Sequence, residues 1–216
     1  MNYLDITNQV LLRLREDTIT SVAGNLDPVV QIVLAHVNDA KRLVEDAATW
    51  NSQRYEWEIT SVVGQDKYPM VGSGNYARIE YMFGSDGSQP VEQRLRDMKR
   101  KKAQGPAGGP SLYYAVNGVD SNNDIQIEFY PTPTVAGTVY SVGGHKRQPD
   151  LVEDGDELTI PDKPVMYYAL AFAARERGEV GGQTAAEIFQ MANQFLMDAI
   201  SLDSNLTDLD NIWMAV

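Results

Sequence analysis

Apolar residues recur every three to four positions through the first fifty residues, which is the pattern of amphipathic helices. The first stretch predicts a short helix over about residues 4–16. A longer helix is predicted to begin at Asp27 and Pro28, because aspartate caps a helix N-terminus and proline fits its first turn. Its apolar stripe continues to Trp50 and includes His36, which we expect to be a core or interface side chain rather than a general base.

After Asn51 the period changes to two, as in half-buried β-strands. The predicted strands span residues 55–60, 77–83, 112–116, 125–130 and 138–144. Turns rich in glycine and proline separate them. A helix rich in lysine and arginine, expected to begin at Pro90 and end at Gly105, interrupts the strands. The middle of the chain is therefore predicted to be a small antiparallel β domain.

Helical periodicity returns after Pro161 and predicts helices over residues 162–177 and 185–202. Each amphipathic helix must bury its apolar stripe, and the other three helices are the obvious partners. We therefore expect an α+β fold in which the N- and C-terminal helix pairs form a four-helix bundle. The expected domains are a bundle of residues 1–50 plus 158–203, a β-rich insert of residues 51–157, and a C-terminal arm of residues 204–216.

The C-terminal segment 204–216 follows the predicted end of the last helix and is expected to be an extended arm. Its apolar residues are Leu206, Leu209, Ile212, Trp213 and Met214. One interpretation is that this arm folds back onto its own core. The other is that it leaves the subunit and binds a groove on a neighbour, where a tryptophan makes a good anchor.

The charge of the chain is unevenly distributed. With 30 acidic and 18 basic residues the formal net charge is −12, which disfavours wrapping of a nucleic acid because phosphate binding relies on lysine and arginine. One segment departs from this balance. Its basic residues are Arg94, Arg96, Lys99, Arg100, Lys101 and Lys102. They form either a solvated helix surface or a docking patch for an acidic neighbour or a nucleic acid.

Residues suited to catalysis are sparse. The sequence has no cysteine and only two histidines, which excludes disulfides, thiolate catalysis and cysteine-ligated metals. The glycine-rich segment 105–110 lacks the Gly-Lys-Ser/Thr of a phosphate-binding loop, and the acidic segment 153–157 lacks the spacing of a calcium loop. We expect no enzymatic activity, no cofactor and no metal. In the absence of a signal peptide or a long apolar span, we also expect a soluble protein with no membrane partner.

Several short motifs occur in order along nearly the whole chain. They are LVEDAATW at residues 43–50, YEWEIT at 55–60, DKYPM at 66–70, YARI at 76–79, GPSLYYAVNG at 109–118 and IQIEFYPTP at 125–133. Together with the predicted order of helices and strands, these motifs resemble the head-to-tail adaptor (connector) proteins of tailed bacteriophages, including the tail tubular protein A type of short-tailed phages.

This resemblance implies a structural virion protein at the head–tail interface, assembled in the host cytoplasm. Such adaptors form a closed homo-oligomeric ring, commonly a dodecamer, below the portal protein, and they present a surface to the next tail or nozzle protein. Genomic DNA would pass through the lumen without sequence-specific binding, and lumenal carboxylates would repel its phosphates. Family members commonly grip the portal with a C-terminal arm or the helical domain. The basic segment would join neighbouring copies or dock on an acidic portal or nozzle surface.

Two other functions are compatible with the sequence. A carbohydrate- or receptor-binding β module of a virion or cell surface is suggested by the aromatic residues Tyr55, Trp57, Tyr113, Tyr114 and Tyr130. Aromatic residues in strands more often belong to the core than to a binding platform. A small hydrolase is the third hypothesis, which the scarcity of reactive groups disfavours.

Overall fold

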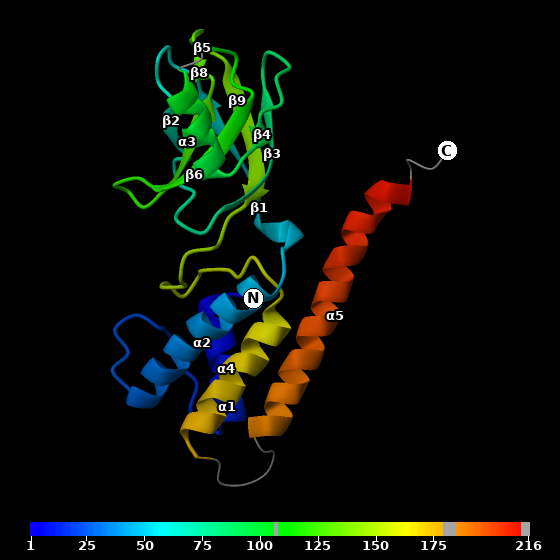
Figure 1. Ribbon diagram of the computed structural model, residues 1–216. Coiled ribbons are helices and arrows are strands. Elements are labelled where there is room, and N and C mark those ends of the chain that lie inside the picture. Colours follow the sequence, from blue (N-terminus) through cyan, green and yellow to red (C-terminus); the bar gives the residue numbers. More distant parts are fainter. Residues whose placement is uncertain (106–107, 179–184, 213–216) are drawn as a thin grey trace. The chain divides into compact units, whose positions relative to one another are not determined.

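The computed structural model describes residues 1–105, 108–178 and 185–212, with side chains described up to residue 204. The chain divides into two compact units. A helical unit combines Met1–Ser52 with Gln148–Val216, and a β unit comprises Gln53–Arg147 (Figure 1). The helical unit is therefore discontinuous in sequence, since the β unit is inserted between its two parts.

The helical unit is built from α1, α2, α4 and α5. Their bounds are α1 Tyr3–Arg13, α2 Pro28–Ala47, α4 Asp162–Glu176 and α5 Ala185–Ile212. The carboxylate of Asp27 accepts a hydrogen bond from the Val29 amide at 2.8 Å, so α2 begins with the predicted cap. Asn2 caps α1 in the same way by accepting from the Asp5 amide at 2.7 Å.

Helix α4 is the centre of the helical unit, because it packs against α1, α2 and α5. Its surface allows this, since buried residues occur on several sides of the helix rather than in one stripe. They are Pro164, Val165, Met166, Tyr168, Ala169, Leu170, Ala171 and Ala173. The three alanines leave room for close approach of the neighbouring helices. The same core contains the fully buried Trp50, whose indole donates to the Val44 carbonyl at 2.9 Å.

The predicted four-helix bundle of two terminal helix pairs is wrong. Helix α5 takes α4 as its main packing partner, whereas α1 and α2 pack against each other and against α4. A central helix that is apolar on several sides covers the stripes of three neighbours, so the four helices do not need to enclose one shared axis. Within the fold class, α+β remains correct: the described residues contain five α-helices and several sheets.

The predicted extended arm is also wrong over most of its length. Helix α5 continues to Ile212 (Figure 1). No glycine or proline lies between Ala185 and Ile212 to end the helix, and the apolar residues Leu206 and Leu209 continue a helical spacing. The end of the arm, residues 213–216, lies outside the described residues.

A polar stripe on α2 holds the segment with which the chain returns to the helical unit. Lys41 and Glu45 are buried and form an ion pair of 3.2 Å. Lys41 donates to the Gln148 carbonyl at 2.7 Å, and the Gln148 amide donates to Glu45 at 3.1 Å. One turn earlier, the Asn38 side chain bonds both the amide and the carbonyl of Leu151. These contacts join the two parts of the discontinuous unit.

The acidic segment 153–157 has a structural role in the same unit. The carbonyls of Asp154 and Asp156 accept from the amides of Leu4 and Tyr3, which belong to the first turn of α1 and have no acceptor within the helix. The Asp154 carboxylate accepts from the Val22 amide at 2.6 Å. These acids therefore satisfy the backbone of the first helix and the loop after it.

The β unit contains two main sheets. Its strands are β1 Arg54–Thr60, β2 Lys67–Pro69, β3 Arg78–Gly84, β4 Val91–Glu92, β5 Gly108–Gly109, β6 Tyr113–Val119, β7 Ile125–Tyr130, β8 Thr132–Pro133 and β9 Val139–His145. The order is β1-β9-β3 in a three-stranded sheet and β2-β7-β6-β4 in a four-stranded sheet, with β5 and β8 as a separate pair. The prediction of an antiparallel β domain is wrong for strand β4, which pairs with β6 in parallel.

The two sheets bury their inner faces in one core. Trp57, Ile59, Met82, Tyr140 and Val142 come from the three-stranded sheet, and Tyr68, Tyr114, Ile125, Ile127 and Phe129 come from the four-stranded sheet. The side chains that alternate with these residues point to the two outer faces of the β unit. Those outer faces carry its candidate functional residues.

The buried ion pair of α2 gives a stability prediction. Replacing Lys41→Met removes the countercharge of a buried carboxylate and should lower the free energy of unfolding by about 3 kcal/mol. The double variant Lys41→Met/Glu45→Met, in which both charges are removed, should lose less than Lys41→Met alone. Urea unfolding followed by circular dichroism measures both values. A Lys41→Met variant within about 0.5 kcal/mol of the wild type would show that the pair does not hold the unit together.

Candidate functional site

Helix α3, Leu95–Gln104, covers the outer face of the four-stranded sheet. It begins later than predicted from Pro90, because Val91 and Glu92 first pair with β6 as strand β4. Met98 is its fully buried side chain, and the helix packs against β6 (Figure 1). The basic segment is thus a helix fixed on a sheet.

The reason for this placement is a buried carboxylate on β7. Glu128 lies between the inward-facing Ile127 and Phe129 and so points to the outer face, yet it is only 2% exposed. It forms an ion pair with Lys102, another with Lys99 at 3.4 Å, and accepts from the Asn117 amide group at 2.7 Å. A buried charge is tolerated when it is paired and hydrogen-bonded, and α3 provides most of that pairing.

Lys102 is the main cation of this cluster. It also binds Asp66, with an Nζ to Oδ2 distance of 2.6 Å. Burial acts to lower the pKa of Lys102, but the hydrogen bonds with Asp66 and Glu128 outweigh it and hold the pKa above the ordinary value for lysine. The ammonium therefore stays charged, as the pairing requires.

On the inner face of the same sheet, burial and, to a smaller extent, the nearby charge of Glu92 raise the pKa of Tyr114 to about 12.

The six basic residues of the predicted patch fall into two groups. The lysines face the sheet: Lys101 lies 3.8 Å from the ring centroid of Tyr113 and donates to Gln93 at 3.0 Å, while Lys99 and Lys102 bind Glu128. The arginines Arg94, Arg96 and Arg100 are exposed, and they form no ion pair with any residue that the structure describes. The arginines are therefore exposed without an ion pair to a described residue, whereas Lys99 is half exposed although it pairs with Glu128.

The outer face of the three-stranded sheet was not recognised from the sequence. Glu56 and Glu58 on β1 and Tyr81 and Phe83 on β3 alternate with core residues and are exposed. Tyr81 and Phe83 lie 5.3 Å apart between ring centroids. The alternation of Glu56-Trp57-Glu58-Ile59 signals the exposed carboxylates, but their position opposite the two aromatic residues depends on long-range strand pairing.

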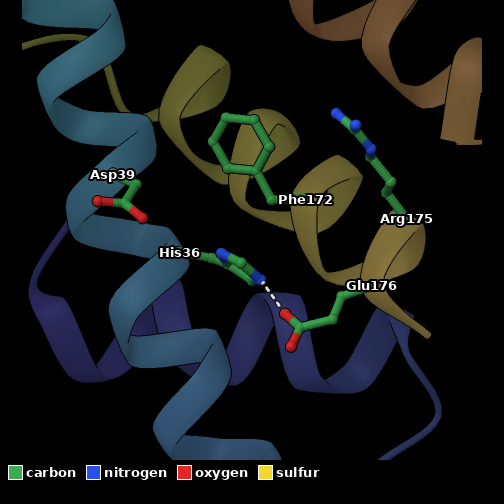
Figure 2. A pocket seen from close by; sticks show the side chains of 5 residues that line it. All are labelled: His36, Asp39, Phe172, Arg175 and Glu176. Atoms are coloured by element: carbon green, nitrogen blue, oxygen red, sulfur yellow. Dashed lines mark hydrogen bonds and ion pairs between the residues drawn. The ribbon is translucent and has the colours of Figure 1, made fainter.

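Each of the two histidines pairs with a glutamate. His36 on α2 pairs with Glu176 on α4, with 2.7 Å between Nε2 and the carboxylate, and its imidazole lies against Phe172 (Figure 2). These residues line a depression of about 360 Å³ together with Asp39 and Arg175. In the β unit, His145 Nδ1 lies 3.4 Å from Glu80. Among the described residues, no group of three or more histidines and carboxylates is arranged to hold a metal ion.

The predicted arm residues are only partly within the description. Leu206, Leu209 and Ile212 belong to α5, whereas Trp213 and Met214 lie outside the described residues. A tie between α5 and the segment after α2 is at Asp203, whose carboxylate accepts from the Asn51 amide at 3.1 Å and whose carbonyl accepts from the Asn51 side chain at 3.0 Å. Just before this tie, Met197 and Leu202 are 65% and 71% exposed.

The aromatic residues behind the carbohydrate-binding hypothesis do not form a platform. Trp57 and Tyr114 are buried in the β core, and Tyr113 lies beneath Lys101. Tyr130 is half-buried, which leaves Tyr55 as the exposed member of the set. A sugar-binding surface needs several coplanar exposed rings, so these residues do not support that function.

The Glu128 cluster yields a second stability prediction. Lys102→Met removes the main cation of a buried carboxylate and should lower the free energy of unfolding by about 2 kcal/mol at neutral pH. Because the folded-state pKa of Lys102 is raised, its contribution to the free energy of unfolding is present below the ordinary lysine pKa of 10.5 and is lost as pH rises through the folded-state pKa. The difference in free energy of unfolding between the variant and the wild type should therefore narrow in alkali. Chemical denaturation of the variant and the wild type at neutral and alkaline pH measures the loss at each pH.

The matched control is Arg96→Met, which removes an exposed charge from the same helix and should change the free energy of unfolding by less than about 0.5 kcal/mol. Equal losses for Lys102→Met and Arg96→Met would contradict the assignment of the lysines to the sheet and the arginines to solvent.

Comparison with known proteins places the chain in a family. The sequence profile of the family described as SU10 adaptor protein matches residues 1–211. A search of curated proteins finds no match. No described helix combines the length and hydrophobicity needed to cross a lipid bilayer. Because the profile covers nearly the whole sequence, the chain belongs to the SU10 adaptor protein family and is a structural adaptor-type protein of bacteriophages.

Proposed function

We propose that this chain forms a closed ring at the head–tail junction of the virion, where it joins the portal to the tail and extends the DNA channel. The observation that carries the proposal is the family match over residues 1–211. Membership of this family implies a virion component that interacts with portal and tail components. The ring, its dodecameric copy number, its assembly in the host cytoplasm and its likeness to tail tubular protein A are parts of the proposal.

The charge of the chain supports a channel through which DNA slides. A net charge of −12 repels phosphate and discourages adhesion of the genome to the lumen. The largest concentration of basic residues does not oppose this role, because its lysines are directed at Glu128 and Tyr113 within the β unit. DNA is therefore proposed to pass without sequence-specific contacts.

The C-terminal part of the chain is the proposed portal contact. Met197 and Leu202 are exposed apolar residues of α5, and the sequence continues this apolar character beyond the tie at Asp203. The residues concerned are Leu206, Leu209, Ile212, Trp213 and Met214. An apolar helix segment with a nearby tryptophan suits a hydrophobic groove on a partner. The downstream tail or nozzle protein would bind elsewhere on the ring.

Electron microscopy of the chain mixed with its cognate portal tests this function. The proposal predicts a second ring stacked coaxially on the portal, with a continuous central channel. Portal particles that remain bare at saturating amounts of folded chain would contradict it.

The portal contact gives a separate prediction. Deleting residues 205–216 removes the apolar end of α5 and leaves its tie at Asp203 in place, so the chain should fold normally and lose at least about 10-fold in portal affinity, because buried apolar anchors carry much of the binding energy at interfaces. Co-sedimentation with portal rings measures the affinity, and circular dichroism checks the fold.

A pair of substitution variants separates apolar contact from length. Leu206→Asp/Leu209→Asp should reproduce the loss, whereas Asp208→Asn/Asp210→Asn, which changes polar positions of the same stretch, should not. Wild-type affinity in the deletion variant would refute this role for the segment.

A further inference from the structure

The β unit presents two different charged surfaces on opposite sides. The arginine face of α3 lies on the outer side of the four-stranded sheet, and the carboxylate face of β1 lies on the outer side of the three-stranded sheet. The shared core lies between them. We propose that the arginine face of one copy docks on the carboxylate face of the next copy, so that β units stack head to tail around the ring. This inference rests on the proposed ring and names the surfaces that build it.

The arginine face is rigidly presented. Arg96 and Arg100 are four residues apart and therefore lie on one side of α3, with their attachment points roughly 6 Å apart along the helix axis. The opposite side of the helix is fixed by Met98 and Lys102, and Lys99, three residues from Arg96, reaches Glu128 from between the two sides. The two exposed guanidinium groups thus project from a helix that cannot rotate without breaking the pairs with Glu128.

The carboxylate face has a matching spacing. Glu56 and Glu58 are two residues apart on β1 and point to the same side, with attachment points about 6.6 Å apart. In the strand register, Glu56 lies across Gly143 from Tyr81, and Glu58 lies across Ser141 from Phe83. The two carboxylates therefore form one row and the two aromatic rings a second, parallel row.

Gly143 brings the two rows together. A side chain at this position would overlap the ring of Tyr81, so the ring lies directly over the glycine and extends across the central strand towards Glu56. A depression of about 420 Å³, lined by Arg54, Tyr55, Glu56, Glu80, Tyr81 and Gly144, opens beside this contact. Small residues on the central strand thus keep the face shallow and accessible.

This combination suits arginine in particular. A guanidinium group pairs with a carboxylate through parallel hydrogen bonds and stacks its plane on an aromatic ring. With α3 of one copy laid along β1 of the next, Arg96 and Arg100 come opposite Glu56 and Glu58, because both pairs repeat at about 6 Å. The remaining charges near the face are Arg54, Arg78 and Glu80. Arg54 is the neighbour of Glu56 on the same side of β1 and lines the same depression, Arg78 lies across His145 from Arg54, and Glu80 pairs with His145.

The opposed positions of the two faces specify the kind of assembly. A twofold dimer uses one self-complementary patch, whereas a ring uses two different patches repeated around an axis. Here both patches belong to one compact β unit and lie on opposite sides of its core, so each copy that docks leaves a free patch for the next. This arrangement leads to a closed ring or an open chain rather than to a dimer.

Charge reversal on each face tests the contact in the full chain. Arg96→Glu/Arg100→Glu and Glu56→Arg/Glu58→Arg should each raise the concentration for half-assembly about 100-fold, because like charges then meet across the interface. An equimolar mixture of these two variants should assemble again, because each mutated face then meets its complement on the other variant. The chain carrying all four substitutions should also assemble alone. Sedimentation velocity measures assembly at low and high salt.

One control variant tests whether net charge alone impairs assembly, and one cross-linking variant tests the contact directly. Arg13→Glu/Lys163→Glu makes the same change in net charge as Arg96→Glu/Arg100→Glu, at exposed positions of the helical unit, and should leave assembly unchanged. Since the chain has no cysteine, Arg96→Cys/Glu56→Cys can be oxidised to test proximity between copies, and dimers and higher oligomers linked by disulfides are expected.

Unchanged assembly of both charge-reversal variants, or failure of their mixture to recover, would overturn the inference. A wild-type chain that stays monomeric at the highest attainable concentration and yields no cysteine-linked species would overturn it as well. The outcome is separable from that of the proposed function. If the chain binds the portal but the charge-reversal variants assemble normally, the contact between copies is wrong and the adaptor role stands. If the mixture of variants recovers assembly but the chain does not bind the portal, the adaptor role is wrong and the contact stands.

Discussion

The buried carboxylate of Glu128 is the constraint on which the surface of the β unit depends. It lies on the outer side of a sheet, where a buried charge without partners would be strongly unfavourable. Helix α3 provides Lys99 and Lys102, which form ion pairs with it. This pairing fixes the rotation of the helix. Lys99 and Lys102 reach Glu128 as a result, and Arg96 and Arg100 are left exposed on the helix.

The helical unit follows a comparable logic with different residues. Helix α2 buries an apolar stripe against α4 and uses Asn38, Lys41 and Glu45 to hold the returning segment at Gln148 and Leu151. An insertion of a whole β unit is tolerated because both parts of the helical unit are joined by specific polar contacts as well as by the apolar core. The chain thus combines two compact units in one member of a phage adaptor family.

Local signals in the sequence predicted the elements well, and long-range relations were the part that failed. The cap at Asp27 and the alternation around Trp57 identified α2 and β1, because caps and periodicity are local. The bundle was wrong because α4 is apolar on several sides, which a single-stripe analysis does not anticipate. The division of the basic segment depends on Glu128, which lies 26 residues from Lys102 along the chain, so no pattern within the segment could reveal it.

A cryo-electron microscopy reconstruction of the assembled head–tail junction tests the central claim most directly. We predict a ring at the portal in which α3 of each copy lies along β1 of the next, with density linking Arg96 and Arg100 to Glu56 and Glu58. A ring whose β units meet through other surfaces, with these four side chains facing solvent, would contradict it.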